Sequence, residues 1–212
     1  MENQTIILQD RADAGKKLAK LLASYKNTNT IVLGLPRGGV VVAYEIAQAL
    51  RAPLDIVVTR KIGAPTNEEY AIGAIGPNNI RVLDEDAIAS LGITQEQIDL
   101  IIKKEKQEMA RRISLYRKNR PELDVKNKIV ILVDDGAATG KTALAAIRFL
   151  KTMRPQKIIF ACGVCATDTA QILRQEVDGV ISLAYPEPFY AVGTWYANFP
   201  QTVDTQVIEL LQ

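Results

Sequence analysis

The sequence of 212 residues predicts an α/β fold in which a mainly parallel sheet is flanked by helices. Short apolar runs rich in β-branched residues alternate with amphipathic stretches, which is the pattern of parallel strands joined by covering helices. The composition, 48% hydrophobic and 24% charged, is ordinary for a globular protein. Because no repeat, low-complexity tract or linker divides the chain, we expect one domain spanning residues 1–212.

In the first half of the chain, helical periodicity and short apolar runs alternate. Residues 11–25 place apolar side chains at helical spacing, and the run TIVLGL at 30–35 is short and β-branched, as in a buried strand. Glycine, proline, asparagine and charges at 61–69 predict a loop. The elements expected here are a helix at 11–25, a strand at 30–35, a helix at 40–50, a strand at 54–60, the loop at 61–69, and short strands at 70–75 and 80–84 around a GPNN turn.

The second half begins with a long amphipathic stretch and continues with strands and helices in alternation. Residues 94–120 carry apolar side chains on one face and charges on the other, which predicts a helix. The remaining expected elements are strands at 128–135, 157–164 and 178–185, helices at 142–153, 167–175 and 203–211, and an aromatic, turn-rich tail at 186–199. We therefore expect a core at about 30–185 with a helical insertion at about 84–120.

The composition excludes several kinds of chemistry. The chain contains no histidine, so histidine triads, histidine-ligated zinc and histidine acid–base catalysis are excluded. The net charge of +2 forces no nucleic-acid or membrane partner, and no apolar run reaches the ~18–20 residues that span a bilayer. The first residues lack a basic segment followed by an apolar one, so we expect a cytoplasmic protein without a signal peptide.

The stretch VDDGAATGKT at 133–142 ends like the phosphate loop of an ATPase, but its register is wrong. A G-x-x-x-x-G-K-[ST] loop would need its first glycine at position 135, which is Asp135. A carboxylate there would point negative charge at the phosphates that the loop must wrap. A nucleoside triphosphate site is therefore disfavoured, although it would predict ATP binding that depends on Lys141.

A different ligand fits the same residues better. A strand that ends in two acids, a turn of small residues and a helix start near Thr142 together form an anion site with exposed backbone N–H groups. Carboxylates at the carboxyl end of the strand accept hydrogen bonds from vicinal hydroxyls, at the edge where α/β sheets bind ligands. A single phosphate and a neighbouring diol describe a ribose 5-phosphate.

The stretch VILVDDGAATGKT resembles the signature of the type I phosphoribosyltransferases, in which hydrophobic residues lead into two acids, small residues and Thr-Gly. The resemblance implies a Rossmann-like core with a small hood built from the N-terminal segment, residues 186–212, or both. It also implies that Asp134 and Asp135 hold the ribose hydroxyls of phosphoribosyl pyrophosphate (PRPP), and that they contact Mg²⁺ indirectly, through those hydroxyls or water. The loop implied for the 5-phosphate is Gly136, Ala137, Ala138, Thr139, Gly140, Lys141 and Thr142.

Two further stretches match the family's sites for pyrophosphate. GLPRGG at 34–39 lies where the family has a pyrophosphate loop, commonly with a cis peptide, although a plain turn before a helix would also explain it. TRKIGAP at 59–65 lies where the family has a mobile lid, and a polar surface loop is the alternative. The residues implied are Leu35, Pro36, Arg37, Gly38 and Gly39 in the loop, and Arg60 and Lys61 in the lid.

The resemblance implies a Mg²⁺-dependent transfer of ribose 5-phosphate between PRPP and a nucleobase-like nitrogen acceptor, with release of pyrophosphate, as in nucleotide salvage. Asp134 and Asp135 would fix the ribose, while Arg37, Arg60 and Lys61 would stabilise the departing pyrophosphate. We expect small-molecule partners (PRPP and a planar base), a homodimer, and neither a nucleic-acid nor a membrane partner.

One residue departs from the pattern. The hypoxanthine-guanine branch of the family reads DTGKT where this chain reads ATGKT, so Ala138 replaces an aspartate thought to assist proton transfer at the purine. The lid also lacks the Ser-Tyr pair of that branch. An alternative is therefore a regulatory protein that binds PRPP or a nucleotide without transferring anything.

Three other features carry alternatives. The tail aromatics Phe189, Tyr190, Trp195 and Tyr196 either stack on a base or pack in the hood. Cys162 and Cys165 form a CxxC that lacks the usual redox or zinc surroundings, so we interpret them as small buried residues beside the site. The basic cluster of Arg111, Arg112, Arg117, Lys118 and Arg120 is either an RNA contact or a solvated helix face, and interleaved acids favour the second.

Overall fold

The computed structural model of the protein describes residues 8–118 and 120–212. Its helices are α1 (Arg11–Leu21), α2 (Gly38–Leu50), α3 (Glu85–Ser90), α4 (Gln95–Tyr116), α5 (Lys141–Thr152), α6 (Thr167–Arg174) and α7 (Asp204–Leu210), with 3₁₀ turns at Ala23–Tyr25 and Val192–Trp195. Its strands are β1 (Thr30–Gly34), β2 (Leu54–Ile56), β3 (Arg60–Ala64), β4 (Asn67–Ile75), β5 (Arg81–Leu83), β6 (Ile129–Ala137), β7 (Lys157–Cys165) and β8 (Gly179–Ala184). Within these two ranges, no helix combines the length and the apolar character that crossing a bilayer requires.

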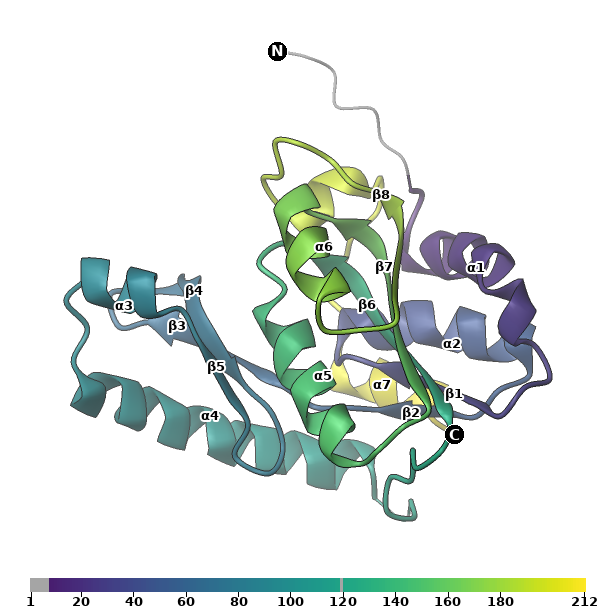
Figure 1. The fold of residues 1–212 in the computed structure, drawn as a ribbon, viewed down its shortest axis with the longest axis horizontal. Coiled ribbons are helices and arrows are strands. Elements are labelled where there is room, and N and C mark those ends of the chain that lie inside the picture. The colour runs from purple at the N-terminus through teal and green to yellow at the C-terminus, as the bar shows by residue number, and fades with distance from the viewer. Residues whose placement is uncertain (1–7, 119) are drawn as a thin grey trace.

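The core is a five-stranded parallel sheet in the order β2-β1-β6-β7-β8 (Figure 1). The register sets Gly34 beside Val133, so β1 and β6 reach the same edge of the sheet together. Because parallel strands are buried on both faces, these strands are almost continuously apolar. The predicted α/β class with a mainly parallel sheet is confirmed.

Helices cover the sheet on both faces. Consecutive side chains of a strand point to opposite faces, so Ile131 packs with Ile46 of α2, while Leu132 packs with Leu144 of α5. Figure 1 shows α1 and α2 on one side of the sheet and α5 and α6 on the other. The side with α5 and α6 also buries Phe160, which is fully enclosed.

A second lobe, residues 60–116, extends from the end of the sheet where β2 lies (Figure 1). It contains the antiparallel sheet β3-β4-β5, on which α4 packs through Ile98 and Ile102. The predicted loop at 61–69 is wrong, because β3 and β4 form a hairpin there. Gly63 permits the close pairing, since a Cβ at that position would lie 2.3 Å from the carbonyl oxygen of Glu68.

Other predicted boundaries in this region also shift. The second strand ends at Ile56 instead of residue 60, because the chain leaves the parallel sheet there and enters the lobe. Helix α3 was not predicted, although Asp84 is a strong start signal and its side chain accepts a hydrogen bond from the amide of Ala87. Helix α4 begins with a capping box between Thr94 and Gln97.

Ion pairs at the end of α4 fasten the lobe to the core. Arg117 donates two hydrogen bonds to the buried Asp55 of β2, at 3.1 and 2.9 Å, and Arg120 lies 3.4 Å from the same carboxylate. Arg111 and Arg112 both pair with Glu108 at 2.7 Å. Arg112, Arg117 and Arg120 are therefore partly buried in ion pairs, whereas Arg111 and Lys118 are exposed, so the solvated face favoured from the sequence is found at only part of the cluster.

The first described residues meet a segment that precedes α7, and together they form the hood, defined here as residues 8–10 and 186–200. Leu8 forms a parallel bridge with Tyr196, and its carbonyl accepts the amide of Ala197 at 2.9 Å. Helix α7 lies elsewhere and packs on α2 and α4. The hood thus combines an N-terminal segment with only the first part of the predicted range 186–212.

Substitution of Asp55 by alanine should destabilise the protein by about 3 kcal/mol, because Arg117 and Arg120, which follow α4, would be left partly buried without their carboxylate. Asp124→Ala is the matched control, since Asp124 pairs with Lys128 while its side chain is 67% exposed, and it should change stability little. Urea unfolding of both variants measures the difference. Equal losses would contradict the anchoring role of Asp55.

Candidate functional site

The PRGG loop and the two acids lie against each other at the carboxyl edge of the sheet. A Cβ at Gly38 would lie 1.9 Å from Oδ2 of Asp135, and one at Gly39 would lie 2.8 Å from Cα of Asp134. The peptide bond between Pro36 and Arg37 is cis. Only glycine allows this loop to approach the end of β6 so closely, so the loop and the acids are positioned by each other.

The two acids have different surroundings. Asp134 Oδ1 accepts the amide of Asp135 at 2.9 Å, and burial, followed by the neighbouring Asp135 carboxylate, raises the pKa of Asp134 well above its usual range. Asp135 instead pairs with Arg11, whose Nε lies 2.7 Å from Oδ2. The Asp134 carboxylate is therefore unfavourably placed when no ligand is bound, whereas the Asp135 carboxylate has Arg11 as a cationic partner.

Arg11 is a site residue that the sequence did not reveal. It is 8% exposed, donates to the carbonyl of Pro200 at 2.6 Å, and lies 3.7 Å over the ring of Phe199. It thereby connects Asp135 to the hood. Its position at the start of the helix predicted for 11–25 gave no sign of this role.

In the pyrophosphate-loop stretch, the residues differ in what they offer a ligand. The amide of Leu35 donates to the carbonyl of Val133 at 2.8 Å and is used within the sheet. Arg37 lies 3.6 Å from Asp204, at the start of α7. The Leu35 amide is therefore not available to a ligand. The Arg37 guanidinium can bind an anion if the anion replaces Asp204 as its partner.

The strand predicted at 128–135 extends further, because β6 continues through Gly136 to Ala137 and so includes the first two residues of the predicted phosphate loop. A Cβ at Gly136 would lie 2.4 Å from Val192 of the hood, and the carbonyl of Ala137 accepts the amide of Ala166 at 2.9 Å. The turn is therefore Ala138, Thr139 and Gly140, with Gly140 at φ +66° as the N-cap of α5. The first amides of α5 then point out of the helix end, as an anion site requires.

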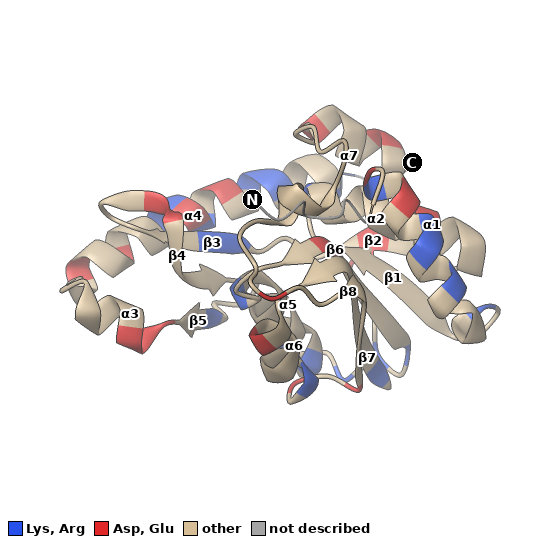
Figure 2. Ribbon diagram, turned by 90° about the horizontal axis from the view of Figure 1, so that it is seen from above, with Lys and Arg blue, Asp and Glu red and all other residues tan. Residues whose placement is uncertain are grey.

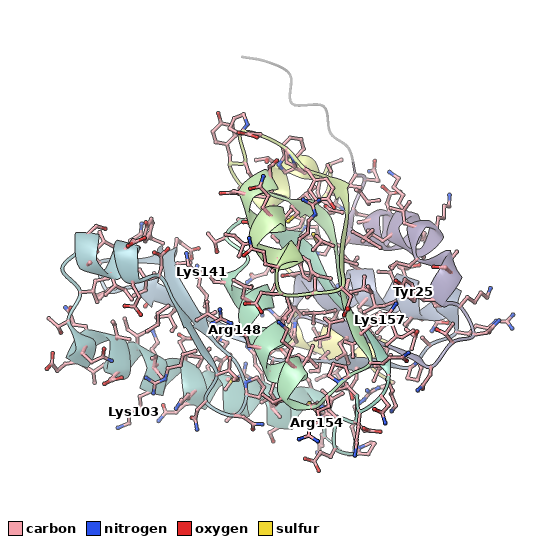
Figure 3. All side chains as sticks on the ribbon, viewed as in Figure 1. Tyr25, Lys103, Lys141, Arg148, Arg154 and Lys157 are labelled. Atoms are coloured by element: carbon pink, nitrogen blue, oxygen red, sulfur yellow. The ribbon has the colours of Figure 1, made fainter. Side chains whose placement is uncertain are left out.

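Lys141 joins this turn to the lobe. Its Nζ lies 2.8 Å from Oδ2 of Asp84 and 3.3 Å from the carbonyl of Ala71, and Figure 3 labels it where α5 begins. The hydrogen bond from Lys141 is the main cause that lowers the pKa of Asp84. Lys141 thus has a structural contact at the place where the sequence predicted a phosphate ligand.

The two cations of the predicted lid face carboxylates of the lobe. Arg60 Nε lies 2.7 Å from Glu105 of α4, and Lys61 Nζ lies 3.1 Å from Glu69 of β4. Figure 2 shows the basic start of β3 beside the charged turns of α4. Both cations also line a cavity of about 270 Å³ within the lobe. The structure therefore brings Arg60 and Lys61 to lobe carboxylates and not to Asp134 and Asp135.

A cavity of about 710 Å³ opens beside the phosphate-loop turn. Ala138 and Thr139 form one wall, the start of α6 another, and Phe189 and Tyr190 a third. The other two tail aromatics pack in the hood: Trp195 is largely covered, and the Tyr196 hydroxyl donates to the carbonyl of Asp135 at 2.5 Å. Of the four tail aromatics, Phe189 and Tyr190 thus line the cavity, whereas Trp195 and Tyr196 pack inside the hood.

Cys162 and Cys165 are buried free thiols on β7. Cys162 lies beside Asp134 in the register, and Cys165 lies beside Ala137. Burial raises the pKa of Cys162 well above its usual range, while a hydrogen bond with Cys162 lowers the pKa of Cys165. Their burial agrees with the interpretation as small core residues beside the site.

The oxygen ligands at this edge suit Mg²⁺, which commonly uses one or two carboxylates, substrate phosphates and water. Asp134 and Asp135 supply two carboxylates, close enough that the charge of Asp135 raises the pKa of Asp134. Within the described parts of the chain, no group of three or more His, Cys, Asp or Glu side chains is arranged to hold a metal ion. The residues therefore fit a magnesium ion that is coordinated mainly by the oxygens of its ligand.

Comparison with known proteins identifies the class to which this fold and site belong. The model of the phosphoribosyl transferase domain matches residues 3–180. The chain therefore belongs to the phosphoribosyl transferase domain family.

Individual relatives agree with this assignment. A Mycobacterium tuberculosis protein, whose name assigns it provisionally to the phosphoribosyl transferases, is 40% identical over 205 residues, which are 97% of this chain. The match covers 46% of that protein, so the chain spans about half the length of the curated relative. The crystal structure of TT1426 from Thermus thermophilus is 36% identical, with a TM-score of 0.78 over 96% of this chain and 97% of that one.

Replacement of the two acids by asparagine, one at a time, should change stability in opposite directions. Asp134→Asn should raise the melting temperature by a few °C, because it removes a buried charge beside Asp135, whereas Asp135→Asn should lower it by depriving Arg11 of its carboxylate. Differential scanning calorimetry, in EDTA and without ligand, measures both variants.

The raised pKa of Asp134 also predicts how the stability difference between Asp134→Asn and the wild type changes with pH. A carboxyl group whose folded pKa is raised contributes stability at low pH, and this contribution is lost as the pH rises from the ordinary value of 3.8 through the folded pKa. The advantage of Asp134→Asn over the wild type should therefore be larger at pH 8 than at pH 5. An advantage that shrinks with rising pH would refute the raised pKa.

Proposed function

We propose that this protein is a Mg²⁺-dependent phosphoribosyltransferase that moves ribose 5-phosphate between PRPP and a nucleobase-like nitrogen acceptor and releases pyrophosphate. The observation that carries the proposal is the meeting of three groups at one edge of the sheet: the acid pair, the PRGG loop packed on it, and the start of α5. The family assignment supports it. The cavity beside the turn that precedes α5 supplies a place for the acceptor.

In this proposal the chain mainly binds and orients. Asp134 and Asp135 accept hydrogen bonds from the two ribose hydroxyls, which also gives the buried carboxylate of Asp134 a favourable partner. Thr139 and the first amides of α5 bind the 5-phosphate, with the helix dipole favouring its charge. Magnesium, when bound, offsets charge on the pyrophosphate oxygens. The hood and lobe exclude water from a reacting C1 that water would otherwise capture.

Pyrophosphate binding requires the cations of the pyrophosphate loop and of the lid to exchange partners. Arg37, Arg60 and Lys61 are each paired with a carboxylate of the chain, so each must move from that carboxylate to the pyrophosphate. Because β3 carries two of them on a hairpin, a shift of this hairpin relative to α4 would move both together. Partner exchange of this kind would couple binding of pyrophosphate to closure of the lobe.

A second candidate function is a PRPP- or nucleotide-binding regulator without transferase activity. Ala138 favours it, because the residue offers no acid for proton transfer at the acceptor. The two candidates share the PRPP site and differ in whether pyrophosphate is released. Binding of PRPP and release of pyrophosphate therefore need separate measurements.

The central test is calorimetric titration of the protein with PRPP in the presence of Mg²⁺. The wild type should bind, and Asp134→Asn should lose at least about tenfold in affinity, because a neutral amide replaces a charged acceptor of the ribose hydroxyls. Since this variant should be more stable than the wild type, unfolding cannot account for the loss. ATP serves as the comparison ligand: tighter binding of ATP than of PRPP, lost in Lys141→Ala, would contradict the proposal.

A second experiment tests the exchange of partners at Arg60. Glu105→Gln should tighten pyrophosphate binding by roughly 1.4- to 5-fold, because an ion pair that competes with the ligand contributes ~0.2–1 kcal/mol. Glu68→Gln is the matched control, since Glu68 pairs with Lys104 in the same lobe and its side chain is 82% exposed. The same affinity in both variants would show that Arg60 does not reach the ligand.

A further inference from the structure

The cavity beside the phosphate-loop turn has a charge pattern of its own. Its volume of about 710 Å³ is within the range of roughly 300–1,000 Å³ of small-molecule sites. Three segments far apart in the sequence line it, namely the turn after β6, the start of α6, and the tail at 186–190. Its charged lining residues are Asp168 and Glu187, and both are acidic. Neither forms an ion pair with a described residue of the chain.

Asp168 is an exposed residue in the first turn of α6, and one of its carboxylate oxygens is available to a ligand. Its Oδ1 accepts the amide of Thr169 at 2.7 Å, while Oδ2 has no hydrogen bond from the parts of the chain that the structure describes. The next residue ties it to the phosphate-loop turn, because the Thr169 hydroxyl donates to the carbonyl of Ala138 at 2.5 Å. The residue that follows Asp168 thus contacts Ala138, and Asp168 and Ala138 line the same cavity.

The tail segment that carries Glu187 also suits a planar molecule. Phe189 and Tyr190 follow the cis peptide between Glu187 and Pro188, and Tyr190 is 70% exposed although it lines the cavity. An aromatic side chain that is exposed at a cavity mouth offers a stacking surface for a flat ring. Two carboxylates without a third ligand are a poor site for a tightly held metal ion, so an organic donor is the better occupant.

We propose that Asp168 and Glu187 select the acceptor, and that this acceptor is a planar nitrogen base that presents N–H donors, as amino or amidine-type edges do, to the two carboxylates. The assignment rests on the proposed transferase function. A base that presents carbonyl oxygens to this wall would place lone pairs against carboxylates with no cation to bridge them. Selectivity against it would come from that repulsion as much as from hydrogen bonds made to the correct base.

The same placement gives Asp168 a part in the reaction. As the acceptor nitrogen forms its bond to C1 of the ribose, the bond from C1 to the pyrophosphate oxygen breaks, and pyrophosphate leaves with that electron pair. The proton on the attacking nitrogen passes to the Asp168 carboxylate, and water later removes it. Asp168 thereby supplies from α6 the acid–base group that Ala138 lacks in the turn.

Matched pairs of bases test the assignment on the wild type with saturating PRPP and Mg²⁺. Adenine is compared with hypoxanthine, and cytosine with uracil, by pyrophosphate release and by calorimetry. We expect the amino member of at least one pair to be preferred at least about tenfold in kcat/KM. A preference for the keto member in both pairs would overturn the proposal.

Variants separate the two carboxylates. Asp168→Asn should lower kcat about 100-fold or more and flatten its pH dependence, while PRPP affinity stays within about threefold of the wild type. Glu187→Gln should raise KM for the base with a smaller change in kcat. Asp99→Asn, an exposed carboxylate on α4 whose side chain is 57% exposed, is the control and should leave both parameters unchanged. Wild-type kinetics in Asp168→Asn would refute its role.

The outcomes also distinguish failure of the acceptor assignment from failure of the proposed transferase function on which it rests. PRPP binding with no binding of any aromatic base would refute the acceptor assignment and leave the PRPP site standing. Failure of the wild type to bind PRPP would refute the proposed function and the acceptor assignment together. Calorimetry in the order PRPP first and base second identifies which of the two has failed.

Discussion

The close approach of the PRGG loop to the end of β6 is the constraint on which the rest of the site depends. Gly38 and Gly39 lie where any side chain would collide with Asp135 or with the backbone at Asp134. This contact fixes the acids relative to the first strand, and it leaves Asp134 buried beside a second carboxylate. Such an arrangement destabilises the free protein locally, and a ligand that donates hydrogen bonds to both acids would relieve it.

Around this centre, cations that suit an anionic ligand are paired with carboxylates of the chain. Arg37 pairs with Asp204, Arg60 with Glu105, and Lys141 with Asp84. The carboxylates come from α7, α4 and the start of α3, so the ion pairs also hold the lobe and the C-terminal helix close to the site. An anion that takes these cations would loosen the same contacts, which gives a physical route from ligand binding to movement of the lobe.

Much of the core could be predicted from the sequence, because buried parallel strands such as that at 129–133 are apolar and the two-acid motif marks their carboxyl edge. The structure of the lobe was harder to predict from the sequence. Residues 61–69 contain glycine, proline and charges, yet they form a hairpin because Gly63 permits close backbone pairing and the charged residues of β4 face solvent. The contact of Arg11 with Asp135, across 124 positions of the chain, and the hydrogen bond from Thr169 to Ala138 leave no local pattern, since only tertiary packing creates them.

The most direct test of the central claim is a crystal structure of the protein soaked with PRPP and Mg²⁺. The account predicts that the two ribose hydroxyls lie on the carboxylates of Asp134 and Asp135, with the 5-phosphate at the first amides of α5 and the pyrophosphate reaching Arg37. A ligand bound with its ribose elsewhere, or a triphosphate wrapped by the turn at Ala138 to Gly140 in preference to PRPP, would contradict it.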